Sequence, residues 1–229
     1  MTTSLTDVSF GLEAEPVRIA GALALPPGRH GKTVSRLSTR SLGQILDLEF
    51  GLIATSPSGS RIELRTDADV VEVELYLTRL QVLERPPTPL SLDVVVDDGA
   101  ARQIVCPEGA VLQVRGPRHM ELADSHPITV VIDDLGIAMK SIEIWLPHNG
   151  FAEVCAVRVA SGSIVTQPAP KPVRWVHYGS SISHCVESRR PTETWPAVVA
   201  RRHGLDLLNL GLAGHCHLDQ LVARDIREA

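Results

Sequence analysis

The sequence predicts a β-sandwich followed by the opening of a three-layer α/β domain. Three features lead to this fold class: aliphatic residues recur with a period of two before residue 166, a proline-rich segment occupies residues 167–172, and a strand–loop–helix pattern repeats from residue 173. We expect an antiparallel, jelly-roll-like sandwich over residues 1–166, a linker over 167–172, and the first βαβα part of an α/β domain over 173–229.

The sandwich is predicted from short half-buried strands separated by turn residues. In residues 71–77, Val, Val, Leu and Leu alternate with Glu, Glu and Tyr, which places the aliphatic set on one face of a strand. Similar strands are predicted at residues 61–65, 92–97, 128–132 and 141–146. No amphipathic helix of normal length is expected before residue 170.

The pattern changes after the proline-rich segment. Residues 173–178 form a short β-prone run, and a helix is predicted to begin after Thr192 or Thr194 and to end at Gly204. Residues 205–210 predict a second buried strand, and residues 218–229 a second helix. Strands that alternate with helices in this way open a parallel sheet.

Composition excludes several classes of function. The chain has 229 residues, 22 Lys+Arg against 27 Asp+Glu, and only 3% aromatic residues, so a nucleic-acid partner is not expected. Its apolar stretches are too short to span a bilayer, and its acidic first residues differ from a secretory signal. The four widely spaced cysteines predict reduced thiols, no metal site and a cytoplasmic protein.

Candidate chemistry lies in the loops that follow the two parallel strands, because ligands of open α/β sheets bind beyond the carboxyl ends of the strands. Ser181 lies just past the first strand, in a Gly-Ser-Ser-Ile-Ser segment that turns sharply. A serine on such a turn can expose its hydroxyl where backbone N–H groups converge. Gly214 closes the second loop, Asn-Leu-Gly-Leu-Ala-Gly, and lets the backbone approach closely.

These two loops resemble the first and second conserved blocks of the SGNH (GDSL-type) hydrolases. The segment Val-His-Tyr-Gly-Ser-Ser-Ile-Ser, residues 176–183, is most similar to a bacterial subgroup in which a β-sandwich precedes a flavodoxin-like hydrolase domain. The resemblance implies that Ser181 is the acylated nucleophile and that the N–H groups of Ser181 and Gly214 are oxyanion donors. Ser180 stands where the family more often has Asp.

The resemblance also implies an activity: acyl-ester hydrolysis or acyl transfer through an acyl-serine intermediate, on a small-molecule ester and with no cofactor. It places Ser180, His184 and His217 at the rim of the substrate site. The two histidines could instead be residues that pack the loops. The family's later Asn block and Asp-x-x-His block have no counterpart before Ala229. We therefore expect the catalytic His and Asp outside this chain, and near inactivity of the chain alone.

Two parallel strands and two helices are also expected to leave most of one sheet face and one edge uncovered. A missing segment, a second chain or an exchanged second copy would complete the sheet. The rival function is a sandwich module that binds carbohydrate or a protein partner. For single residues, Trp145 could face outward to bind sugar or pack between the domains, Cys185 could be a thiol nucleophile or a buried structural thiol, and the histidines of the two loops could hold a metal.

Overall fold

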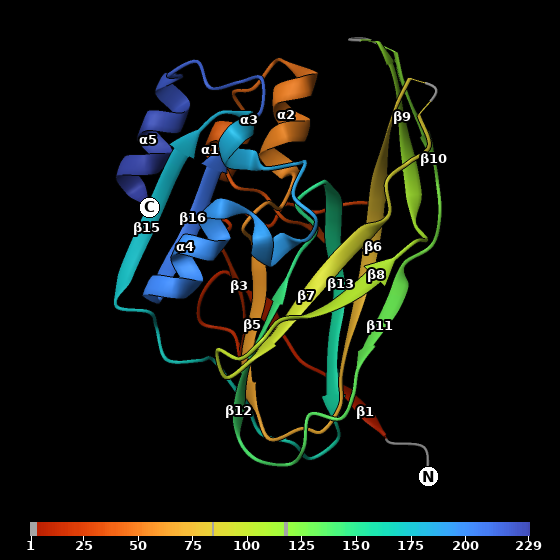
Figure 1. Ribbon diagram of the computed structural model, residues 1–229, viewed down its shortest axis with the longest axis vertical. Coiled ribbons are helices and arrows are strands. Elements are labelled where there is room, and N and C mark those ends of the chain that lie inside the picture. The colour runs from red at the N-terminus through yellow and green to blue at the C-terminus, as the bar shows by residue number, and fades with distance from the viewer. Residues whose placement is uncertain (1–3, 84, 117–118) are drawn as a thin grey trace.

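The computed structural model describes residues 4–83, 85–116 and 119–229. Within them the strands form two sheets of seven strands and a third sheet of two (Figure 1). The first sheet contains β1 (Leu5–Asp7), β4 (Lys32–Thr33), β6 (Val71–Val82), β9 (Ala110–Gly116), β10 (His119–Ala123), β11 (Ile128–Ile132) and β13 (Gly150–Ala160). The second contains β2 (Phe10–Gly11), β3 (Val17–Ala20), β5 (Arg61–Thr66), β7 (Leu90–Val96), β8 (Arg102–Cys106), β12 (Lys140–Trp145) and β14 (Val165–Thr166).

The two seven-stranded sheets share one hydrophobic core. Val73 and Leu75 of β6 are fully buried there, as their alternation with glutamates predicts, and they meet Ile62 of β5 and Ile144 of β12. The strands predicted at 61–65, 92–97, 128–132 and 141–146 are confirmed as β5, β7, β11 and β12, with small shifts at their ends.

Both large sheets are mixed, whereas the sequence analysis expected antiparallel strands throughout. β6 pairs with β9 in parallel, from Thr78↔Ala110 to Val82↔Val114, and β2 pairs with β3 in parallel. The reason for the first pairing is the path of the chain. After β6 the chain crosses to the other sheet, forms the β7–β8 pair there, and then returns, so β9 enters in the same direction as β6.

Two helices lie in a region where no helix of normal length was expected. α1 (Thr39–Leu42) is capped by Ser38, and α2 (Leu48–Thr55) begins at Asp47, whose carboxylate accepts from the backbone N–H groups of Glu49 and Phe50. α2 has only eight residues and is apolar around most of its circumference, so it carries no helical periodicity that could be recognised.

The C-terminal elements follow the predicted order. β15 (Val173–Gly179) leads into α3 (Ser181–His184), the 3-10 helix η1 (Pro191–Glu193), α4 (Trp195–His203), β16 (Leu205–Gly211) and α5 (Gln220–Glu228). β15 and β16 pair in parallel over their whole lengths, from Val173↔Leu205 to Gly179↔Gly211. α4 ends at Gly204, whose φ of 62° is left-handed, and this confirms the predicted helix end.

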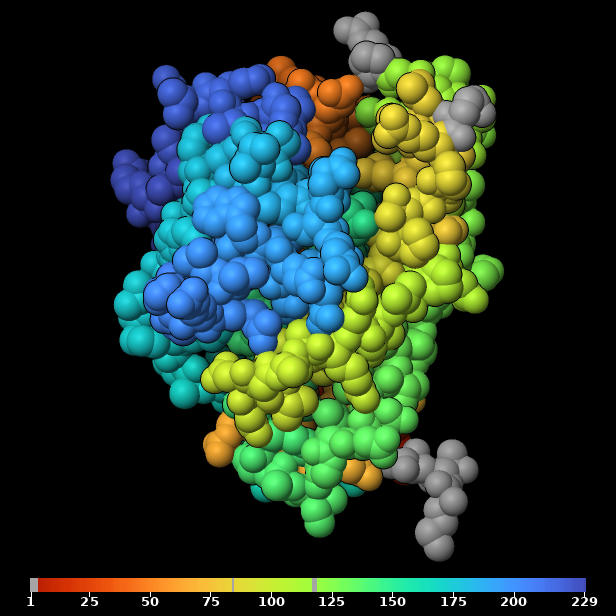
Figure 2. All heavy atoms as spheres, in the orientation of Figure 1, coloured from red at the N-terminus to blue at the C-terminus, as the bar shows by residue number. Residues whose placement is uncertain are grey.

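Residues before β15, called the N-terminal part below, and helices α4 and α5 cover both faces of β16. On one face, Leu207 packs with α4 and with Val95 and Trp145 of the second large sheet. On the other, Leu208 and Leu210 pack with Phe50 of α2 and with α5. Figure 2 shows the blue C-terminal residues lying directly against the yellow-green residues of β7 and β8. β16 is therefore covered on both faces, contrary to the expectation for the sheet, whereas β15 has no buried residue.

Trp145 is 1% exposed, so its indole belongs to this contact between the two parts of the chain and not to an outward-facing sugar platform. A charge cluster continues the contact. The fully buried guanidinium of Arg61 pairs with Glu63 at 2.6 Å and with Asp206 of β16 at 2.7 Å. Burial alone would raise the pKa of Asp206, but Arg61 and Arg18 outweigh it and hold that pKa below its usual range.

Across the described ranges, no helix has the length and apolar character needed to cross a membrane.

Candidate functional site

The turn after β15 presents Ser181 to solvent. Ser180 is extended, with φ −95° and ψ −151°, and Ser181 is the first residue of α3. The turn is closed by hydrogen bonds from the backbone N–H of Ser183 to Ser180 O and from Cys185 N–H to Ser181 O. A methyl group at Gly179 would overlap the Ser183 side chain, so this approach requires glycine. The chain therefore turns sharply enough to expose Ser181.

The loop after β16 begins level with this turn. Gly211 is the register partner of Gly179, and Leu212 N–H donates to Gly179 O at 2.8 Å. Residues 212–215 then form a turn in which His215 N–H bonds to Leu212 O and Gly214 has a φ of 76°, which favours glycine. Ser181 and Gly214 thus lie on adjoining loops at the carboxyl edge of the parallel pair.

The backbone of α3 rests directly on Gly211. A methyl group at Gly211 would overlap the backbone atoms of Ser183 and His184. The Asn209 side chain supports the same contact: its Nδ2 donates to Ser183 O at 2.9 Å, and its Oδ1 accepts from Gly211 N–H at 2.9 Å. Asn209 stands in the second motif, yet the sequence analysis assigned it no role, because a strand residue gives no sign of what it faces.

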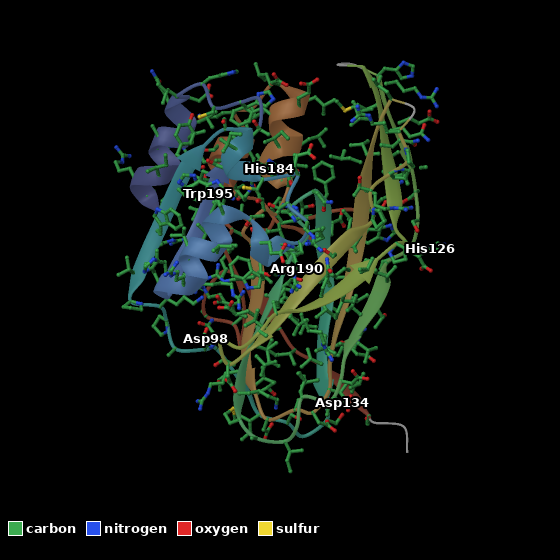
Figure 3. All side chains as sticks on the ribbon, in the orientation of Figure 1. Asp98, His126, Asp134, His184, Arg190 and Trp195 are labelled. Carbon is green, nitrogen blue, oxygen red and sulfur yellow. The ribbon has the colours of Figure 1, made fainter. Side chains whose placement is uncertain are left out.

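His184 does not lie at a substrate rim. His184, labelled in Figure 3, lies on α3 and is 3% exposed. Its Nε2 lies 3.1 Å from Ser56 Oγ and 3.0 Å from His148 O. Burial, with a contribution from the Arg36 charge, lowers the pKa of His184 to about 3. The imidazole is therefore neutral at physiological pH and packs the Ser181 turn onto the N-terminal part.

The other residues named from the sequence keep more exposed positions. Ser180 is half-buried, and His217 is exposed beside His215, whose ring stacks on Phe50 of α2 at a centroid distance of 5.2 Å. His177 Nε2 lies 2.7 Å from Ser183 Oγ, and burial lowers its pKa.

Neither the thiol nor the metal alternative gains support from the contacts. Cys185 Sγ lies 2.9 Å from Ile182 O, and burial raises the pKa of the thiol, which disfavours the reactive thiolate. In residues 4–83, 85–116 and 119–229, no three His, Cys, Asp or Glu side chains converge as a metal site would require.

An exposed serine at the end of one parallel strand, beside a glycine turn at the end of the next, is typical of α/β serine hydrolases. Residues 171–229 match the GDSL-like lipase/acylhydrolase family. This match confirms, for residues 171–229, the family resemblance predicted from the two loop motifs.

Solved structures share the fold over nearly the whole chain. The salicylyl-acyltransferase SsfX3 from a tetracycline biosynthetic pathway matches 99% of this chain and 59% of its own length, with a TM-score of 0.81 and 25% identity. A protein described as a GDSL-like lipase from Bacteroides ovatus matches 91% of this chain and 58% of its own, with a TM-score of 0.63 and 19% identity. A family two carbohydrate esterase from Cellvibrio japonicus matches 90% of this chain and 51% of its own length, with a TM-score of 0.51 and 10% identity.

This chain thus spans about three-fifths of the length of the first two proteins. A search of curated proteins found no match.

Proposed function

We propose that this chain carries the nucleophile and two oxyanion donors of a serine acyl hydrolase or acyltransferase. Ser181 is the nucleophile, and the backbone N–H groups of Ser181 and Gly214 are the donors. The carrying observation is the pairing of Gly179 with Gly211, which starts the two loops at the same level, with Ser181 exposed on the first of them.

In the proposed reaction, Ser181 Oγ attacks the carbonyl carbon of an ester and its proton passes to a general base. The carbonyl oxygen becomes an oxyanion that accepts hydrogen bonds from the two amides. The ester C–O bond then breaks, the departing alcohol takes the proton, and the acyl group remains on Ser181. Water or an acceptor alcohol attacks this acyl-serine and releases a carboxylic acid or a new ester.

The base in this scheme is neither His177 nor His184. His177 is already bonded to Ser183, and the buried Nε2 of His184 faces Ser56 and the His148 carbonyl. Following the family motifs, we assign the role to a His–Asp pair outside these residues.

Both outcomes of the second step remain within the proposal. The similarity to an acyltransferase over 99% of this chain supports transfer to an acceptor, and the similarity to esterases supports hydrolysis. Either way the substrate class is a small-molecule acyl ester. The sugar-binding alternative loses its aromatic candidate, because Trp145 is buried.

The test is turnover of p-nitrophenyl acetate and labelling by a fluorophosphonate in the full-length gene product. Ser181→Ala should abolish both, whereas Ser161→Ala, which changes an exposed serine after β13, should leave both unchanged. Equal turnover in wild type and both variants would refute the proposal.

A further inference from the structure

One guanidinium group from the N-terminal part is hydrogen-bonded to the end of β16, where the loop that carries Gly214 starts. Arg36 is fully buried, and its Nη1 donates to Asn209 O at 2.9 Å and to Gly211 O at 2.8 Å. Its Nη2 donates to Ile53 O, at the end of α2, at 2.6 Å. Alternate carbonyls of a strand point to the same edge, so Arg36 lies along the edge of β16 and reaches Gly211, the residue before the Gly214 turn.

A hydroxyl group from the N-terminal part is hydrogen-bonded to the Ser181 turn. Ser58 is fully buried, and its Oγ donates to His184 O at 2.8 Å. The same oxygen accepts from Asn209 Nδ2 at 3.2 Å, and Nδ2 also donates to Ser183 O. Ser58 therefore joins the end of α3 to β16 through one oxygen atom.

These contacts leave little room for adjustment. A methyl group at Gly59, next to Ser58, would lie 2.8 Å from Asn209 Cβ, so the loop backbone is in direct contact with β16. Arg36 hydrogen-bonds only backbone carbonyls within the described residues, and burial lowers its pKa to about 9. Burying a guanidinium group with no carboxylate partner lowers the stability of the fold. We therefore infer that the planar arrangement of the Arg36 N–H donors is required at this position.

We propose that Arg36 and Ser58 are positioning residues of the active site, which hold the Ser181 turn and the Gly214 turn at the separation that oxyanion binding needs. The inference rests on the function proposed above. Oxyanion donors act only within about 0.5 Å of their productive positions, and a displacement of about 1 Å can lower a rate about 100-fold. In this account the N-terminal part is a structural component of the catalytic site.

The first test compares two matched serine variants in the full-length gene product. Ser58 and Ser60 are both fully buried, and each donates to one backbone carbonyl at 2.8 Å, but the partner of Ser60 is Gly21 O. Both variants should lower stability, Ser58→Ala somewhat more because it also removes an acceptor of Asn209 Nδ2. Only Ser58→Ala should lower kcat for p-nitrophenyl acetate and the rate of fluorophosphonate labelling, each about 10-fold, with KM nearly unchanged.

The second test replaces Arg36 by Lys, which keeps the charge but cannot reach all three carbonyls with one planar group. Arg158→Lys, in an arginine of β13 paired with Glu74 and Asp7, is the control. Arg36→Lys should lower kcat about 10-fold or more and Arg158→Lys should not. This pair decides the question if Ser58→Ala does not fold.

The outcomes separate the two proposals. The positioning role is overturned if turnover depends on Ser181 but Ser58→Ala lowers it no more than Ser60→Ala, and Arg36→Lys lowers it no more than Arg158→Lys. The proposed function would then still stand. Turnover that does not depend on Ser181 would overturn both.

Discussion

Acidification should destabilise the protein through His184. The His148 carbonyl is an acceptor, so His184 Nε2 carries the proton and donates. Nδ1 is then the unprotonated nitrogen, and it is buried without a hydrogen-bond partner among the described residues. Protonating Nδ1 would place a second cation near the buried Arg36 with nothing to accept its hydrogen.

The size of the effect follows from the two pKa values of His184. An unfolded histidine has a pKa of about 6.5, and in the folded protein burial lowers that of His184 to about 3. At pH 5 the unfolded chain therefore binds nearly one proton at this position, and the folded chain binds almost none. Stability is fully present above about pH 6.5, and the free energy of unfolding falls by about 2 kcal/mol by pH 5.

Urea unfolding at pH 7 and pH 5, followed by circular dichroism, measures this loss. His148 and His177 also have lowered pKa values and act in the same direction, so the comparison that isolates His184 is with His184→Gln. The variant should lose about 2 kcal/mol less than the wild type between the two pH values. An identical loss in both proteins would refute the reasoning.

Two further predictions concern the contacts that join the parts of the chain. Asp206→Asn removes a charge paired with the fully buried Arg61. It should lower the free energy of unfolding at pH 7 by about 3 kcal/mol. A loss below about 1 kcal/mol in urea unfolding would show that the pair contributes little to stability. Gly211→Ala adds a methyl group that overlaps the α3 backbone, so fluorophosphonate labelling of Ser181 should slow about 100-fold, and labelling at the wild-type rate would show that the turn does not depend on this contact.

Local patterns predicted seven of the sixteen strands in the described residues, together with helices α4 and α5. The alternation in residues 71–77 marks the buried face of β6, and Gly204 marks the end of α4, because strand periodicity and helix termination are local properties. The same local signals placed Ser181 and Gly214 at the carboxyl ends of two neighbouring strands.

Pairing direction and long-range contacts could not be predicted in this way. The parallel pairing of β6 with β9 depends on the chain crossing between sheets, which no residue pattern records. His184 belongs to a sequence block that suggested a loop rim, yet its environment is set by Ser56 and by the His148 carbonyl, both distant in the sequence. Arg36 likewise looks like an ordinary surface arginine until the fold brings it to β16.

The central claim is that Ser181 and Gly214 form one anion-binding site. A crystal structure of the full-length protein after reaction with a phosphonate inhibitor tests it most directly. The account predicts a covalent bond from Ser181 Oγ to phosphorus, with one phosphonyl oxygen about 2.7–3.1 Å from the backbone nitrogens of both Ser181 and Gly214. A phosphonate on another residue, or one on Ser181 whose oxygen points away from Gly214, would contradict the account.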